Sequence, residues 1–303
     1  MTYQPFGLQF FGRISASLAR AVSNRIQPLR LLLEIRPSSL RRLASHTCYT
    51  ALALLALFSD TPALNAAEIL EEIIERDYPI DTTAKFSLKN AEGMVLIYGA
   101  DIKEMKVQAI KKAYTKDRLS KINVDISVRP DVVTINTAYP SKPKWGLRDR
   151  SGTVDYVIIL PWFCDVENVE LGTGEMLIEG MRGNEVHAQL GNGRLFGHNC
   201  FTDLHLSLGA GGIDVQYDWW ETHEIGLDAK IAEGNTRLFI PSDAQFQLRA
   251  EALDGHVFSD FTNKEDRHRG GQTKLELSVG DAPNAQMKIQ ATEGSVKIME
   301  TNL

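Results

Sequence analysis

The sequence predicts an all-β fold in which a β-solenoid, also called a β-helix, is built from coils of about 18–23 residues. Glycines that close successive coils recur at intervals of 19, 18, 23, 21 and 39 residues, and the last interval equals about two coils. These glycines are Gly174, Gly193, Gly211, Gly234, Gly255 and Gly294. The stretches EVHAQLGNG at 185–193 and DLHLSLGAG at 203–211 share one pattern. Each begins with an acid, an aliphatic residue and a histidine and ends in Leu-Gly-x-Gly.

Apolar and polar residues alternate before each of these glycines. At three, five and seven residues before the glycine, seventeen of the eighteen positions are apolar, and Glu167 in the first coil is the exception. Alternation with a period of two is typical of a strand with one buried face. Its recurrence indicates coils that stack on one another, and a tight corner favours glycine because a side chain would block close backbone approach.

Residues 1–66 have the features of a leader segment. They contain seven arginines, no lysine and only two acidic residues. Arg41 and Arg42 precede the apolar run ALALLALF at 51–58, and small residues follow it up to Ala66, in the order of a secretory signal with cleavage near Ala66. The run is too short for a permanent membrane span. We therefore expect an exported protein in the periplasm, on the outer surface or secreted, with no transmembrane span in the mature chain. A buried helix, a start codon assigned too early and an organelle-type transit segment are the alternatives.

The chain beyond residue 66 is strongly acidic. The whole sequence has 33 basic and 39 acidic residues, and without 1–66 these fall to 26 and 37, a formal charge of −11. Such a surface repels phosphate backbones, which argues against nucleic acid as a general partner.

A short helix and a series of strands are expected between the leader and the repeats. The stretch AAEILEEIIERD at 66–77 has a helical composition, so a capping helix and lead-in are predicted at 67–82, over the open edge of the first coil. From residue 83 the segments AKFSLKN, GMVLIYG, EMKVQAI, INVDISV and VVTINTAYP are short, β-rich and bounded by turn residues. VDYVIILP at 154–161 and TRLFIP at 236–241 are apolar strands that end at a proline. Residues 83–303 are therefore expected to form a single solenoid domain.

Several segments together resemble a family of bacterial domains. They are AEGMVLIYGADIKEMKVQA, VDYVIILP, the LGTG, LGNG and LGAG corners, and LFIPSDAQFQLRAEALDGHVFSDF. The family is the bacterial putative-adhesin domain of unknown function, related to toastrack-type domains. The resemblance implies an exported, right-handed β-solenoid in the cell envelope and supplies no catalytic residues. The chain departs from the family pattern at Trp162 and Phe163 and at the insertion DWWETHE at 218–224, where we expect contacts particular to this protein.

Histidines and acids are expected to gather on the outer face of three neighbouring coils. His187 and His205 stand six residues before their glycines, Asp228 occupies the same place in the next coil, and Glu185 and Asp203 stand eight residues before. Residues i and i+2 share a strand face and stacked strands lie about 4.8 Å apart, so the five side chains would form one patch. Imidazoles and carboxylates are suitable ligands for Zn²⁺ or another transition metal. The alternative is a solvated polar face without metal, since an open strand rarely closes a tetrahedral shell.

Two loops carry tryptophans beside charges. In YDWWETHE, Trp219 and Trp220 stand among acidic residues and can form a stacking surface for sugars or protein, unless one of them folds over the core. In the loop at 139–150, Trp145 is accompanied by four basic residues, Lys142, Lys144, Arg148 and Arg150. That loop can hold an anionic glycan, a lipid headgroup or an acidic partner, or be an ordinary solvated hairpin loop.

The two cysteines of the repeat region are predicted to remain separate thiols. Cys164 lies ten residues before Gly174, and Cys200 lies eleven before Gly211. This phase places them two coils apart, so their Cα atoms would be about 9–10 Å apart. A disulfide requires less than about 7 Å.

The motifs leave three functional hypotheses. The sequence contains no G-x-S-x-G, H-E-x-x-H, Gly-Lys-Ser/Thr or Cys-x-x-Cys motif. The first hypothesis is therefore a non-enzymatic, exported β-solenoid that binds an envelope glycan or protein without a cofactor. One alternative is a carbohydrate-active or metal-dependent hydrolase or lyase centred on Glu185, His187, Asp203 and His205, with a transition metal as cofactor. Another is a periplasmic component of an envelope signalling system.

Overall fold

The structure is a computed structural model, and it describes residues 68–141, 149, 151–262, 273–281 and 283–301. The chain divides into two units, 1–64 and 65–303, and all described residues belong to the second. The leader predicted at 1–66 therefore lies outside the described residues. Within them every element is a β-strand except one short helix, α3 (Lys116–Ser120). No helix in this part of the chain is long and apolar enough to cross a membrane.

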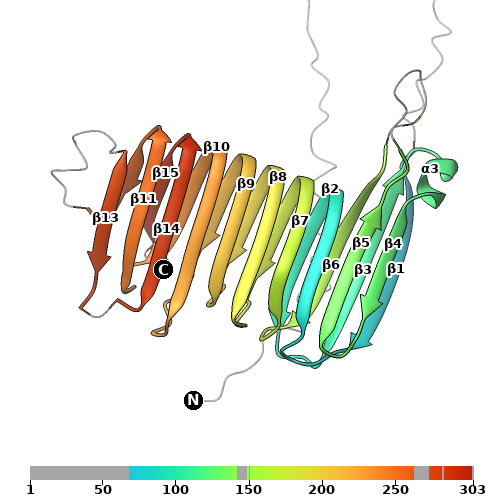
Figure 1. Cartoon of the computed structure of the whole chain (residues 1–303), viewed down its shortest axis with the longest axis horizontal. Coiled ribbons are helices and arrows are strands. Elements are labelled where there is room, and N and C mark those ends of the chain that lie inside the picture. The colour runs from blue at the N-terminus through green and yellow to red at the C-terminus, as the bar shows by residue number, and fades with distance from the viewer. Residues whose placement is uncertain (1–67, 142–148, 150, 263–272, 282, 302–303) are drawn as a thin grey trace, which may run out of the picture. The chain divides into compact units, whose positions relative to one another are not determined.

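The longest strands pair in parallel, with glycine opposite glycine. They are β2 (Lys85–Ala100), β7 (Asp165–Glu179), β8 (Glu185–His198), β9 (Asp203–Gln216) and β10 (Ile225–Pro241), which lie side by side in this order (Figure 1). Their register aligns Gly93, Gly174, Gly193, Gly211 and Gly234. It also aligns Val186, Leu204 and Leu227, all of which are buried. The predicted stacking of these three apolar positions is confirmed.

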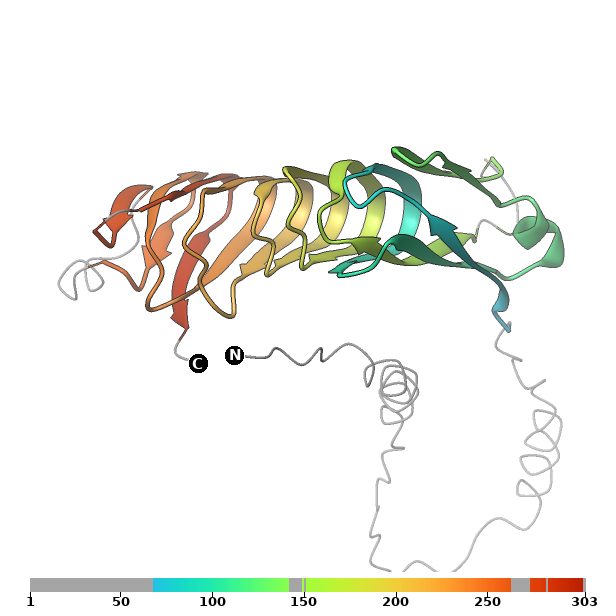
Figure 2. The ribbon, with the colours of Figure 1, turned by 90° about the horizontal axis from the view of Figure 1, so that it is seen from below.

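Each of these strands bends at its glycine and contributes to two layers (Figure 2). The half of β2 before Gly93 pairs with β5 (Val132–Ala138), and the half after it pairs with β6 (Thr153–Pro161). We call the halves before the glycines the first layer and the halves after them the second layer. Alternate side chains of both halves are buried, so the core lies between the layers.

The N-terminal end of the sheet is built from hairpins rather than from a helix. The segment predicted as a capping helix at 67–82 instead contains strand β1 (Leu70–Pro79), which pairs antiparallel with β3 (Glu104–Ala113) along its whole length. Acids of β1 face lysines of β3, as in the pair of Glu72 and Lys111, whose charged atoms lie 2.7 Å apart. A ten-residue ladder with complementary charges outweighs the helical propensity of this segment. β3 pairs in turn with β6, and β4 (Asn123–Val128) pairs with β5.

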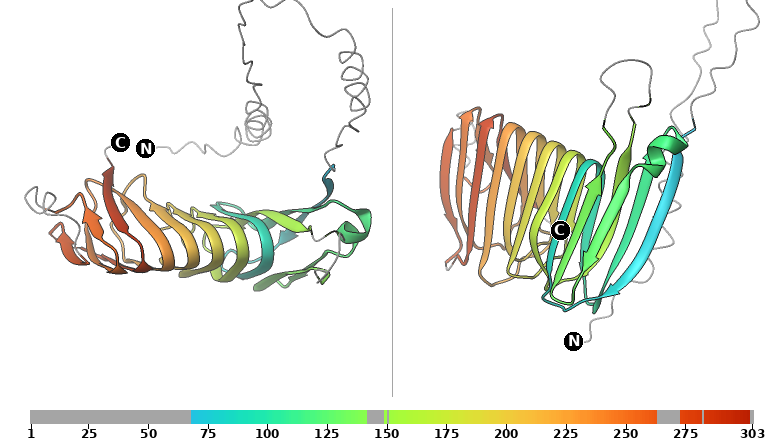
Figure 3. Two further views of the ribbon diagram at one scale, coloured as in Figure 1. Left: turned by 90° about the horizontal axis from the view of Figure 1, so that it is seen from above. Right: turned by 45° about the vertical axis from the view of Figure 1, so that its right-hand side comes forward.

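The C-terminal strands do not follow sequence order. β14 (Ala285–Glu293) pairs in parallel with β10 on one side and with β11 (Phe246–Asp254) on the other, and β13 (Lys274–Val279) closes the edge antiparallel to β11. In the second layer, β15 (Val296–Thr301) lies between β10 and β12 (Val257–Ser259) in the same way (Figure 3). The order of closing glycines is therefore Gly234, Gly294, Gly255. The expected sequential order of the last two coils is wrong, because β13 runs antiparallel to β11 at the outer edge and the chain then turns back, so that β14 enters between β10 and β11.

A β-bulge explains the single polar residue in the predicted apolar pattern. The register of β7 against β8 shifts between Val166 and Val169, so one extra residue is accommodated there. Val166 takes the buried position, and Glu167 is turned out to bind the Nζ atom of Lys85 at 2.5 Å. The bulge keeps the core apolar in the first coil as well.

The two thiols of the described residues are free, as predicted. Cys164 and Cys200 are both buried and form no disulfide. Burial raises the pKa of Cys164 to about 12 and that of Cys200 to about 11. Both thiols are therefore protonated at neutral pH and act as small apolar side chains of the core.

Candidate ligand-binding groove

The turns that lead from the second layer back to the first stack in a row along one side of the fold. We call this row of turns the edge, and the groove along it the edge groove. The turns follow β6, β7, β8 and β9. Backbone hydrogen bonds join neighbouring turns: the amide of Arg182 donates to Trp162 at 2.6 Å, and that of Phe201 donates to Met181 at 3.1 Å. Residues at matching places in these turns therefore lie next to one another.

An aromatic and cationic stack runs along this edge. The guanidinium carbon of Arg182 lies 5.8 Å from the ring centroid of Trp162 and 5.2 Å from that of Phe201. The Phe201 ring lies 5.6 Å from Trp219 and 5.9 Å from His223, measured between centroids. Stacking of this kind fixes the side chains before any ligand arrives.

Glu221 holds the arginine of this stack in place. Its two carboxylate oxygens accept hydrogen bonds from both terminal nitrogens of Arg182, at 2.5 and 2.6 Å, and one of them also accepts from the Trp219 indole at 2.9 Å. The hydrogen bond from Arg182 lowers the pKa of Glu221 although partial burial opposes the shift. The bidentate pair neutralises the charge of Arg182.

The paired tryptophans divide between surface and core. Trp219 is 46% exposed, whereas Trp220 packs against the core, with its ring centroid 5.7 Å from Tyr217 and 6.3 Å from Phe246. Trp219 thus lies at the surface, where a binding residue is expected, whereas Trp220 folds over the core. The other predicted binding residues, Trp145, Lys142, Lys144, Arg148 and Arg150, lie outside the described residues.

A groove of about 860 Å³ follows the stacked turns. It is bordered by aromatic, amide and carboxylate side chains from five segments that succeed one another along the sheet, those after β6, β7, β8 and β9 and that before β14. The lining includes Phe163, Arg182, Asn184, Phe201, Asp203, His223, Glu224 and Asn284. Gly226 forms part of it, and a Cβ atom there would come within 2.6 Å of the Asp203 carboxylate, so this carboxylate extends over the Gly226 backbone.

The five residues of the predicted metal patch are brought together only in part. In the register Glu185 faces Asp203, His187 faces His205, and His205 faces Asp228, as predicted. The two imidazoles stack with centroids 4.4 Å apart, and His187 Nε2 lies 2.9 Å from Glu185. Asp228 instead pairs with Lys230 at 2.9 Å. No group of three or more His, Cys, Asp or Glu side chains in the described ranges is placed to hold a metal ion. Metal binding by this patch stays a prediction.

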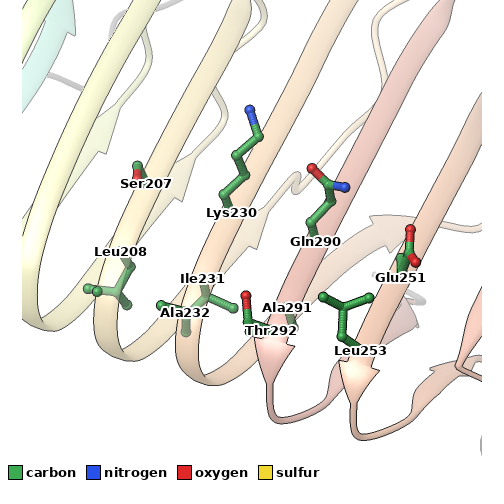
Figure 4. A pocket seen from close by; sticks show the side chains of 11 residues that line it. Ser207, Leu208, Lys230, Ile231, Ala232, Glu251, Leu253, Gln290, Ala291 and Thr292 are labelled. Carbon is green, nitrogen blue, oxygen red and sulfur yellow. The ribbon is translucent and has the colours of Figure 1, made fainter.

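A second depression, of about 570 Å³, crosses the outside of the first layer. Figure 4 shows Ser207, Lys230, Gln290 and Glu251 side by side on successive strands. Its charges already have partners, since Lys230 binds Asp228 and Glu251 binds Lys274, each at 2.9 Å. It also lacks aromatic side chains, so the edge groove is the better candidate site.

A histidine network ties neighbouring turns together beside the groove. His198 lies 3.3 Å from Glu179 through Nδ1 and 2.8 Å from Asp218 through Nε2. Asn199, at φ 50°, donates to the same Asp218 carboxylate at 3.0 Å and accepts a hydrogen bond from the Asp218 amide. The hydrogen bond with Glu179, supported by that with Asp218, raises the pKa of His198 above its ordinary value, while burial opposes the shift.

This network predicts a loss of stability as pH rises above 6.5, the ordinary pKa of histidine. A raised folded-state pKa means that the contribution of His198 is fully present below the unfolded value of 6.5 and is lost as pH rises through the folded value. The pKa of Asp218 is lowered despite partial burial, because Asn199, Gln216 and His198 stabilise the carboxylate, and its contribution is lost only in acid. We expect the free energy of unfolding of the wild type, from urea titrations, to fall as pH rises above 6.5. His198→Asn should flatten this fall, and an unchanged slope in that variant would contradict the assignment.

Several groove residues, Asn184 among them, were not singled out from the sequence. Arg182, Phe201 and Asn284 lie in irregular turns, and no periodic pattern identifies them. Phe163, which is 48% exposed, was indicated in the sequence only as a departure from the pattern of the family that the chain resembles. Asn284 reaches the groove only because β14 lies beside β10.

Comparisons with known proteins give distant structural similarities. No protein-family model and no curated protein matches the chain. Among solved structures, it is similar to a putative cell adhesion protein from Clostridium sporogenes, with 16% identity and a TM-score of 0.49 over 77% of this chain and 100% of that one. It is also similar to a putative adhesin from Bacteroides fragilis, with 10% identity and a TM-score of 0.28 over 75% of this chain and 97% of that one. A third similar structure is that of a putative lipid binding protein from Parabacteroides distasonis, with 11% identity and a TM-score of 0.34 over 75% of this chain and 97% of that one. Two of the three descriptions name the class that the sequence resembles, and at these TM-scores the similarities assign no function.

Proposed function

We propose that the protein is a non-enzymatic, exported, right-handed β-solenoid that binds an envelope polymer or protein through the edge groove. The observation that carries the proposal is the groove itself, which has the exposed ring of Phe163 and several polar side chains in its lining. The exposed ring of Trp219 lies beside it, 5.6 Å from the Phe201 ring between centroids. Exposed rings offer large, rigid contact surfaces for sugar rings or protein side chains, and nearby amides and carboxylates supply hydrogen bonds.

The anchoring of the groove residues supports binding rather than simple exposure. Trp219 is held by Glu221, which is itself fixed by Arg182, so little side-chain entropy remains to be lost when a ligand binds. A ligand that covers Trp219 and Phe163 would therefore gain most of the contact energy of both rings.

Removing the exposed rings is expected to abolish most of the binding. On an array of bacterial envelope glycans and in pull-downs with envelope proteins, Phe163→Ala and Trp219→Ala should each lower affinity about tenfold or more. The matched control is Phe258→Ala, which removes a 42% exposed ring from β12, outside the groove lining. Wild-type affinity in both the Phe163→Ala and the Trp219→Ala variants, with folding verified by circular dichroism, would overturn the proposal.

An enzymatic role of the histidine and acid patch is the second candidate. It is favoured only by the register neighbours Glu185 and Asp203 and by the stacked histidines. Metal analysis of the purified protein separates the two functions. Stoichiometric transition metal that is lost in a His187→Ala, His205→Ala double variant would support a metal-dependent hydrolase.

A further inference from the structure

The groove has the length of an extended chain rather than of a small molecule. Its lining comes from five segments that succeed one another along the sheet. Neighbouring strands lie about 4.8 Å apart, so four steps span about 19 Å. A groove of this length accommodates several consecutive units of a linear polymer.

The backbone along the groove is already hydrogen bonded between turns. The amides of Arg182 and Phe201 donate to the preceding turns, and the amide of Asp203 donates to Asn184 at 3.3 Å. A peptide cannot add to these groups as a further β-strand, which is the usual way in which sheets bind extended peptides. Recognition must use side chains, and the exposed rings suit the flat faces of sugars.

The uncompensated charges of the groove are negative. Arg182 is its one basic side chain among the described lining residues other than histidine, and Glu221 neutralises it. Asp203 and Glu224 form no ion pair within the described part of the chain, whereas Glu185, opposite Asp203 on the neighbouring strand, contacts His187 at 2.9 Å. The carboxylates of Asp203 and Glu224 are therefore free to pair with a positively charged ligand.

We infer that the groove binds a linear amino-sugar polymer that carries free ammonium groups, an inference that rests on the proposed function. Sugar rings would lie on Phe163 and on the exposed ring of Trp219, which packs beside the groove on the buried Phe201. Ammonium groups would bind Asp203 and Glu224, and Asn184 and Asn284 would bond to hydroxyl groups. The acidic charge of the whole chain favours the approach of such a polymer.

Three hexasaccharides that differ only at carbon 2 test this inference on the full chain. They are the β-1,4-linked hexamers of glucosamine, N-acetylglucosamine and glucose, which carry an ammonium, an acetamide and a hydroxyl group. In calorimetric titrations at mildly acidic pH and low salt, the glucosamine hexamer should bind about tenfold more tightly than either neutral hexamer. This advantage should shrink as salt is added.

Charge removal and ring removal should have different effects. Asp203→Asn and Glu224→Gln should reduce the affinity for the glucosamine hexamer to that for the neutral hexamers. Glu233→Gln, at an exposed carboxylate of β10 outside the groove lining, is the matched control and should change nothing. Phe163→Ala should weaken all three ligands equally.

The outcomes separate this inference from the proposed function. Equal affinity for all three hexamers, or no binding of any, overturns the amino-sugar assignment. If other envelope glycans or proteins still bind and depend on Phe163 and Trp219, the proposed function stands. Binding of hexalysine as tight as that of the glucosamine hexamer would instead assign the groove to cationic peptides and overturn the inference.

Discussion

Gly211→Ala is expected to destabilise the protein by roughly 3–5 kcal/mol. Gly211 lies at a bend between the layers with φ +134°, a region that L side chains rarely adopt, and a Cβ atom there would overlap the carbonyl oxygen of Gly193 on the neighbouring strand. Gly193 cannot move away, because it packs in turn against Gly174 on the next strand. Urea denaturation followed by circular dichroism measures the loss.

The next residue provides a matched control for this prediction. Gly212 has an ordinary backbone conformation, and the nearest atom to an added Cβ is the carbonyl oxygen of Asn235 at 3.8 Å. Gly212→Ala should therefore change the free energy of unfolding by less than about 1 kcal/mol. Equal effects of the two substitutions would contradict the stacking of corners.

Removal of residues 283–303 is expected to unfold more than the end of the chain. These residues include β14 and β15, which pair on both sides with other strands. They also bury the core side chains Met287, Ile289, Ala291, Val296 and Ile298. Since one large apolar core side chain contributes about 2–5 kcal/mol, their joint loss approaches the total stability of a typical domain.

Hydrogen exchange followed by mass spectrometry locates this effect. Amides of β11 and β13 should lose their protection in the shortened chain, and those of β10 should lose part of theirs, because β14 pairs with both β10 and β11. Amides of β7 and β8 should keep theirs. Native protection of β11 in the shortened chain would contradict the central position of β14.

The parts of the fold that repeat were predictable from the sequence. Alternation and glycine spacing gave the correct inward positions of Val186, Leu204 and Leu227, because each strand buries one face against the same core. The same frame placed His187 beside His205 and kept Cys164 apart from Cys200. Because the same buried positions recur on each strand, the sequence carries a repeating apolar pattern.

The ends of the sheet were not predictable in the same way. The β1 segment has helical composition, and its partner β3 lies more than 20 residues further along the chain, so only the tertiary pairing reveals a strand. The place of β14 between β10 and β11 depends on the reversal at β13, and identical alternation would fit either order. The groove shares this difficulty, since its aromatic and amide residues come from turns that are adjacent only after stacking.

The order of β10, β14 and β11 is the central claim, because it builds both the C-terminal core and the last segment of the groove. Lys230, Gln290 and Glu251 occupy one outward row on these strands (Figure 4). Adjacent strands bring Cα atoms to about 5 Å, within disulfide range, whereas strands two apart are about 10 Å distant.

Engineered disulfides measure this order directly. With Cys48 replaced by serine, and with the buried native thiols unreactive at neutral pH, the Lys230→Cys, Gln290→Cys pair should cross-link under mild oxidation. The Lys230→Cys, Glu251→Cys pair should stay reduced. Efficient cross-linking of the second pair without the first would show that the strands follow sequence order and would contradict the structure and the groove derived from it.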